Sequence, residues 1–138
     1  MSTETIPIRN VGDLMHQGVY ACSEHLRLPE AARLMTEHGV RALVVTDATC
    51  GLRGLVSQRD LVNAAVQHGM GEQWRALTVA DVMTRAVITI TPDAPISEAA
   101  RLMIERHIHR LVVVEPDDPC KPIGVVSMGD LVRFLMQE

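Results

Sequence analysis

The chain contains one sequence pattern twice, and this duplication constrains the fold more than any other feature. The first matched segment, residues 11–15, returns as residues 79–83 after a shift of 68 positions. The other matched pairs are residues 30–35 and 98–103, 43–45 and 111–113, 54–57 and 124–127, and 60–62 and 130–132. A repeat of this length is typical of a duplicated half-domain, in which each half covers the apolar face of the other.

Hydrophobic periodicity within the second copy predicts the order strand, helix, strand, strand, helix. Apolar residues recur at helical spacing from Ile96 to Ile104, and the apolar run from Leu111 to Val114 is typical of a strand buried on both faces. The expected elements are a strand at 87–90, a helix from residue 96, a strand at 111–114, a turn at 116–119, a strand at 123–126 and a helix at 128–137. A right-handed crossover then joins the first two strands, a hairpin follows, and the helices cover one face of the sheet.

The fold class that follows is α/β (α+β), with two βαββα repeats packed with pseudo-twofold symmetry. We expect an N-terminal extension at residues 1–10, a first repeat at 11–69, a linker at 70–78 and a second repeat at 79–138. At 138 residues with 47% apolar content, the chain can bury one core but has no room for two independent domains of ordinary size. One compact globule is therefore predicted.

The charge and cysteine content of the chain argue against several classes of partner and compartment. The net charge is −4 and Lys and Arg form no basic run, so we expect no nucleic-acid partner. Three cysteines at wide spacing argue against a disulfide framework and for a reducing compartment. No stretch approaches the roughly 20 apolar residues that span a bilayer, so we expect a soluble, cytoplasmic protein with no membrane partner.

Two strand-to-helix junctions carry the most informative polar residues. One places Ser57 and Asp60 at the start of a helix, and the other does the same with Ser127 and Asp130. Backbone N–H groups and the helix dipole favour an anionic ligand there, and the carboxylate can accept hydrogen bonds from both hydroxyls of a ribose. The same Ser-x-x-Asp pattern is also a capping box. The motif by itself therefore leaves a binding role and a capping role open.

A histidine and an arginine before the buried strand of the second copy favour the binding role. Arg110 could reach a phosphate with two parallel charge-assisted hydrogen bonds, and His109 could donate another. The alternative is that both side chains form a solvated strand entrance. The first copy has Arg41 and Ala42 at the matching positions, so it keeps one cation and loses the pair. We therefore expect two unequal ligand sites, with the stronger one at Asp130.

The duplicated pattern resembles a tandem pair of CBS domains, which is called a Bateman module. The resemblance covers residues 11–134, and the doubled Gly-h-Val-Ser-x-x-Asp-Leu segment, in which h is an apolar residue, makes it specific. Members of this family bind AMP, ADP, ATP or S-adenosylmethionine between the two repeats, and they usually act as regulatory modules. The resemblance therefore implies a regulatory module that binds an adenosine nucleotide.

The same resemblance assigns roles to individual residues. The stronger site would comprise His109, Arg110, Ser127, Asp130, Leu26 and Ala31. The weaker site would comprise Arg41, Ser57, Arg59, Asp60, Ala94 and Ala99. In the stronger site, the first two residues would contact phosphate, the next two would hold the ribose, and the last two would lie near the base. In the weaker site, Arg59 would supply a cation that Ala42 cannot.

Catalysis and metal binding have little support in the sequence. No Ser or Cys has a recognisable His partner for nucleophilic catalysis, and no phosphate loop of the Gly-x-x-x-x-Gly-Lys type occurs. Cys22 with His25, and His107 with His109, offer too few ligands for a structural zinc site. We therefore expect no enzyme activity, no catalytic cofactor and no metal.

The protein expected from these patterns is a sensor that binds an adenosine nucleotide and passes its state to a separate, unidentified partner protein by a change of shape. Closed twofold dimers are the commonest oligomers, so we also expect a homodimer. Two alternatives stay open. One is a module that binds S-adenosylmethionine or NAD, and the other is a dimerisation or docking module without a nucleotide ligand, in which the Ser-x-x-Asp pairs are only caps.

Overall fold

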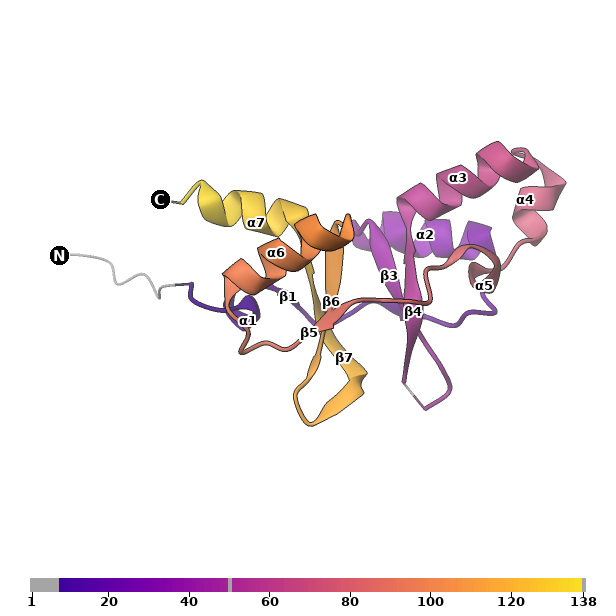
Figure 1. Ribbon diagram of the computed structural model, residues 1–138. Helices are drawn as coiled ribbons and strands as arrows, with labels where there is room; N and C mark the ends of the chain where they lie inside the picture. The colour runs from indigo at the N-terminus through magenta and orange to yellow at the C-terminus, as the bar shows by residue number, and fades with distance from the viewer. Residues whose placement is uncertain (1–7, 50, 138) are drawn as a thin grey trace. The chain divides into compact units, whose positions relative to one another are not determined.

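A computed structural model describes residues 8–49 and 51–137 of the chain (Figure 1). These residues form two compact units. Unit 1 consists of the described residues up to Gly18 together with those from Ile88 onward, and unit 2 consists of Val19–Val87. Each unit packs helices on a β-sheet of its own, so the predicted α/β (α+β) fold class is confirmed.

Unit 1 is built on a four-stranded sheet with the strand order β1-β7-β6-β5. Its elements are α1 (Val11–Leu14), β1 (His16–Gln17), β5 (Thr89–Ile90), α6 (Ile96–Arg106), β6 (Arg110–Glu115), β7 (Asp118–Ser127) and α7 (Met128–Leu135). β5 runs parallel to β6, whereas β6 pairs with β7, and β1 with β7, in antiparallel fashion. The predicted succession of strand, helix, hairpin and helix is therefore confirmed for the second copy.

Unit 2 repeats this arrangement on a three-stranded sheet with the strand order β2-β3-β4. Its elements are β2 (Ala21–Cys22), α2 (Leu28–His38), β3 (Ala42–Thr46), β4 (Leu52–Ser57), α3 (Gln58–His68), α4 (Glu72–Ala76) and α5 (Val79–Val82). The short helix α4 lies within the predicted linker at 70–78. It is fixed to α3 because the indole N–H of Trp74 donates to the carbonyl of Leu61 at 2.9 Å.

Both long helices of each unit pack on one face of its sheet, because their apolar stripes meet alternate residues of the central strands. The core of unit 2 draws on α2, β3, β4 and α3 through Leu28, Ala31, Met35, Leu43, Val45, Val56, Leu61 and Ala64. The core of unit 1 repeats the pattern with Ile96, Ala99, Met103, Leu111, Val113, Val126 and Leu131. Full burial of a side chain such as Met35 or Met103 contributes about 1.5–3 kcal/mol.

Several boundaries differ from the sequence prediction, and β7 begins at Asp118 rather than at residue 123. The predicted turn at 116–119 is too long, because Glu115 already pairs with Asp118 and only Pro116 and Asp117 make the turn. Pro119 is tolerated in β7 because the β6–β7 ladder is irregular next to the hairpin turn. The strand expected at 87–90 spans only Thr89–Ile90, and the last helix ends at Leu135 rather than at residue 137.

Each unit takes its opening helix from the other copy of the repeat. Helix α1 belongs to the first copy in sequence but lies in unit 1, where the backbone N–H of Val11 donates to the carbonyl of Ala94 at 2.9 Å. Helix α5 opens the second copy but lies in unit 2, where Val79 donates to Leu26 at 2.8 Å. Both valines are fully buried. The structural units are therefore offset from the sequence repeats.

Cys22 and Cys120 differ in burial and therefore in expected reactivity. Burial in the core of unit 2 raises the pKa of the Cys22 thiol to about 11, whereas Cys120 is exposed. Since the thiolate is the reactive form, iodoacetamide at pH 8 should modify Cys120 and leave Cys22 unmodified in the folded protein. Peptide mapping by mass spectrometry measures this, and equal modification of both cysteines before unfolding would contradict it. Cys50 lies outside the described residues.

Candidate functional site

The two strand-to-helix junctions form reciprocal capping boxes. At the start of α7, the backbone N–H of Ser127 donates to Asp130 Oδ2 at 2.7 Å, and that of Asp130 donates to Ser127 Oγ at 3.2 Å. At the start of α3, the matching distances between Ser57 and Asp60 are 2.8 and 3.3 Å. The capping role is therefore confirmed at both junctions. It engages one oxygen of each carboxylate and does not decide what the other oxygen binds.

The cationic residues that were predicted to contact phosphate lie beside these junctions. Arg110 opens β6 and pairs with Ser127 across the ladder, and the carbonyl of His109 accepts the backbone N–H of Met128 at 2.8 Å. The structure therefore brings His109, Arg110, Ser127 and Asp130 to one end of the sheet of unit 1. The side chain of His109 is exposed and that of Arg110 is half-buried.

Unit 2 repeats this geometry without the adjacent histidine and arginine. Ala42 pairs with Ser57 across the β3–β4 ladder, and the carbonyl of Arg41 accepts the backbone N–H of Gln58 at 2.9 Å. Arg41 and Arg59 are both exposed, on either side of the junction in sequence. The predicted difference between the copies is therefore present in the fold, while the relative strength of the two sites stays a prediction.

The residues predicted to lie near the base are mostly core residues. Ala31 and Ala99 are fully buried in the cores of units 2 and 1, and Ala94 is also buried. Leu26 is only partly buried, and its carbonyl accepts the N–H of Val79. Contacts of these four residues with a ligand stay a prediction.

Two residues at the Asp130 junction were missed by the sequence reasoning. His16 Nε2 lies 3.0 Å from Asp130 Oδ1, and the guanidinium of Arg133 binds the same oxygen. Arg133 is three positions after Asp130 on one helix face, and this spacing could have predicted the contact. His16 is 114 positions away from Asp130 and comes close only because β1 pairs with β7, which places His16 opposite Val125.

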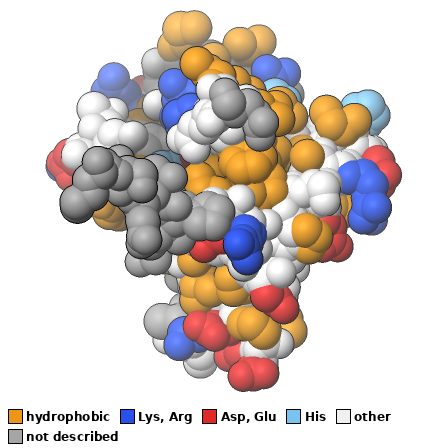
Figure 2. All heavy atoms as spheres, turned by 90° about the vertical axis from the view of Figure 1, so that its left-hand side faces the viewer, with side chains coloured by type: hydrophobic (Ala, Val, Ile, Leu, Met, Phe, Trp, Pro, Cys, Tyr) orange, Lys and Arg blue, Asp and Glu red, His pale blue; other side chains and the backbone are white. Residues whose placement is uncertain are grey.

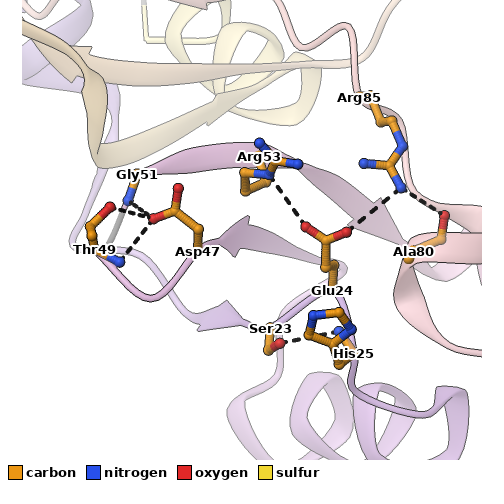
Figure 3. A network of polar contacts seen from close by, with 9 residues as sticks. All are labelled: Ser23, Glu24, His25, Asp47, Thr49, Gly51, Arg53, Ala80 and Arg85. Carbon is orange, nitrogen blue, oxygen red and sulfur yellow. Dashed lines mark hydrogen bonds and ion pairs between the residues drawn. The ribbon is translucent and has the colours of Figure 1, made fainter.

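A second polar network, in unit 2, joins the segment after α5 to the sheet (Figure 3). The carboxylate of Glu24 receives Arg53 from β4 at 3.3 Å and Arg85 at 3.7 Å. Arg85 also donates to the carbonyl of Ala80 at 3.4 Å. Nearby, hydrogen bonds from the hydroxyl of Thr49 and the backbone of Gly51 hold the pKa of Asp47 below its usual value. These contacts fix loops of unit 2 against one another.

Metal-binding clusters and membrane-spanning helices can be sought only in the described part of the chain. Within residues 8–49 and 51–137, no three His, Cys, Asp or Glu side chains gather closely enough to hold a metal ion. The Cys22 side chain is buried, whereas that of His25 is exposed. None of the helices in this described part of the chain has the length and apolar character needed to cross a bilayer.

Comparison with known families identifies the family to which the two sequence repeats belong. The model of the CBS domain matches the chain twice, over residues 11–67 and over residues 79–137. The chain belongs to the CBS domain family. The resemblance inferred from the doubled Ser-x-x-Asp segment is therefore confirmed.

Curated relatives match most of this chain, and their own chains differ in length. An uncharacterised protein of Methanopyrus kandleri is 32% identical over 90% of this chain and 61% of its own length. The mitochondrial CBS domain-containing protein CBSX3 of Arabidopsis thaliana is 31% identical over 85% of this chain and 56% of its own length. YhcV of Bacillus subtilis is 30% identical over 88% of this chain and 82% of its own length. The chain thus spans less than two thirds of the first two relatives.

Solved structures of CBS domain pairs are similar to this chain over nearly all of its length. The CBS domain pair of protein MJ0100, in complex with 5′-methylthioadenosine and S-adenosyl-L-methionine, has a TM-score of 0.84 at 25% identity and covers 95% of this chain and 98% of its own. CBSX2 in complex with AMP has a TM-score of 0.75 at 28% identity and covers 93% of this chain and 96% of its own. Both of these structures contain ligands built on adenosine.

Proposed function

We propose that this CBS domain protein is a regulatory module that binds an adenosine nucleotide at its strand-to-helix junctions. The observation that carries the proposal is the junction of β7 and α7, where Ser127 and Asp130 begin the helix and Arg110 lies directly across the ladder. The complexes of MJ0100 and CBSX2 support it, because 5′-methylthioadenosine, S-adenosyl-L-methionine and AMP share an adenosine ribose.

The chemistry of the junction suits a ribose phosphate. An ionised carboxylate only accepts hydrogen bonds, and the two hydroxyls of a ribose are donors that the Asp130 carboxylate can accept. Arg110 and His109 provide the charge-assisted donors for a phosphate, at an end of the sheet where the first turn of α7 adds its own N–H groups. The junction at Asp60 has the same acid and hydroxyl but lacks the His-Arg pair, so we expect it to bind less tightly.

We propose binding rather than catalysis, and the way the serines are held supports this. As far as the structure describes the junctions, each serine is paired with an aspartate through a capping box rather than with a histidine that could activate it. We infer that the ligand acts by changing the shape of the module, and that a separate partner protein responds to this change.

Calorimetry and thermal-shift assays with AMP, ADP, ATP, NAD and S-adenosylmethionine test the proposal. We expect at least one of the adenosine nucleotides to bind and to raise the melting temperature, because a ligand that binds only the folded state stabilises it. Tighter binding of NAD or S-adenosylmethionine than of the nucleotides would favour the alternative ligands. A folded protein that binds none of the five would refute the proposal.

Exposed apolar side chains on the helices favour a second role, in association with another copy of the chain. Figure 2 shows one face of the molecule on which hydrophobic side chains form a broad patch among scattered charged ones. The exposed large apolar residues of the last helices of the two repeats are Val62 and Val66 on α3, and Val132, Leu135 and the adjoining Met136 on α7. Val62 and Val132 occupy matching positions of the repeat, so the two copies expose the same helix face. We therefore propose a homodimer.

Replacing Leu135 with glutamate is expected to dissociate this homodimer, because a charge would have to be buried in the apolar interface. The side chain of Leu135 is 66% exposed, so the substitution should leave the fold intact. Light scattering at micromolar concentration should give a dimer for the wild type and a monomer for Leu135→Glu. Gln73→Glu, at an exposed polar position of α4, is the matched control and should stay dimeric. A monomeric wild type would contradict the prediction.

A further inference from the structure

The carboxylate of Asp130 is held by two side chains that the proposed function does not use. Its Oδ2 accepts the backbone N–H of Ser127, as the capping box requires. Its Oδ1 is bound by both His16 and Arg133. The oxygen that would face a ribose is therefore occupied by hydrogen-bond donors of the protein itself.

The burial of these three groups shows which of them can move. The side chain of Asp130 is 3% exposed, whereas those of His16 and Arg133 are 73% and 62% exposed. Turning an exposed side chain away leaves the core of the unit unchanged, because its outer atoms contact solvent. The carboxylate of Asp130 is thus fixed in place, whereas the side chains of His16 and Arg133, which donate hydrogen bonds to it, can be displaced by a ligand.

Among the described contacts, the Asp60 junction of unit 2 lacks this cover. Asp60 is half-buried, and its Oδ2 accepts the backbone N–H and the hydroxyl of Ser57. The positions that match His16 and Arg133 hold Thr84 and Asn63. No contact of either residue with Asp60 occurs among the contacts described for unit 2. The two junctions therefore share their caps and differ in what covers the acid.

We propose that His16, assisted by Arg133, competes with the ribose for Asp130 Oδ1 and so sets how tightly this site binds an adenosine ligand. The inference rests on the proposed function, since it concerns the same site. An ionised carboxylate cannot donate, so the imidazole N–H, the guanidinium and the ribose hydroxyls are rival donors to the same oxygen. The affinity of the site for an adenosine ligand is then lower than it would be without His16 and Arg133.

This competition can be tested at one site by introducing His16→Ala into the Asp60→Asn protein. AMP binding to the double variant is then measured by calorimetry. Loss of a single hydrogen bond to the acid should tighten binding about three- to tenfold relative to the Asp60→Asn parent. His16→Gln keeps an N–H donor of similar reach and should restore the weaker affinity of the parent. His68→Ala, at an exposed histidine ending α3, should leave the affinity unchanged.

The outcomes separate this inference from the proposed function. Tighter binding in His16→Ala that His16→Gln reverses, with an unchanged melting temperature in the absence of ligand, supports the competition. Equal or weaker binding in His16→Ala overturns the inference and leaves the proposed function standing. If neither the Asp60→Asn protein nor its His16→Ala derivative binds AMP, ribose binding at Asp130 is refuted, whatever the wild type does. The inference is then refuted as well.

Discussion

Replacing Gly54 with alanine is expected to destabilise the protein by about 2–3 kcal/mol, because the new methyl group would overlap a backbone atom. A Cβ at Gly54 would lie 2.5 Å from the carbonyl oxygen of Thr84. That oxygen accepts the backbone N–H of Leu55 at 3.0 Å, and Thr84 donates back to the carbonyl of Leu55 at 2.9 Å. The close approach therefore holds the segment after α5 against β4, and a backbone atom cannot rotate out of the way.

Urea unfolding measures this loss of stability against a glycine that has room for a methyl group. Gly71→Ala is the matched control, because no heavy atom lies within 4 Å of the position its Cβ would take. A Gly54→Ala protein as stable as Gly71→Ala would show that the segment does not pack against β4. Gly124→Ala should have a similar cost in unit 1, where the Cβ would lie 2.7 Å from the carbonyl oxygen of His16.

Replacing Asp130 with asparagine is expected to weaken nucleotide binding at its junction by about 10- to 100-fold. The reason is that hydrogen bonds to a charged acceptor are worth roughly 1.5–3 kcal/mol, and the amide removes the charge and one acceptor. Asparagine keeps a side-chain oxygen for the N–H of Ser127, so the capping box and the fold should survive. Calorimetry with AMP in the Asp60→Asn background measures this site alone.

The chain contains its own control for this substitution. Asp81 occupies the same position in the capping box of α5, where it accepts the backbone N–H of Thr78 at 2.8 Å, but it is exposed and has no proposed ligand role. Asp81→Asn should therefore leave AMP binding unchanged. If Asp130→Asn binds AMP as tightly as Asp81→Asn does, the Ser-x-x-Asp junctions are only caps and the interaction-module alternative gains support.

The elements of the two units could be predicted where the sequence pattern is local and long enough. The periodicity from Ile96 onward predicts α6, and the apolar run from Leu111 to Val114 predicts a strand whose four apolar residues are indeed buried. Helices α1 and α5 span four residues each, which is too short for a helical period to appear. Their exchange between the copies could not be predicted, because a repeat shows which residues match but not which half they pack against.

The same distinction between local and distant contacts applies to the candidate site. Ser127 and Asp130 form one motif, and strand pairing places Arg110 beside them. All three could therefore be predicted from short segments of the sequence. The contact of Arg133 with Asp130 could also have been predicted from the i, i+3 spacing of the two residues on one helix. The contact of His16 with Asp130 could not have been predicted, because it depends on the pairing of β1 with β7, which are far apart in the sequence.

A crystal structure of the protein with AMP would show directly whether Asp130 binds the ribose. We expect the ribose hydroxyls to lie within about 2.6–3.0 Å of the Asp130 carboxylate, with the phosphate near Arg110 and His109. Occupation of the Asp60 junction in the same manner would agree with a second, weaker site. AMP bound away from both acids, or absent at saturating concentration while the protein is folded, would contradict the account.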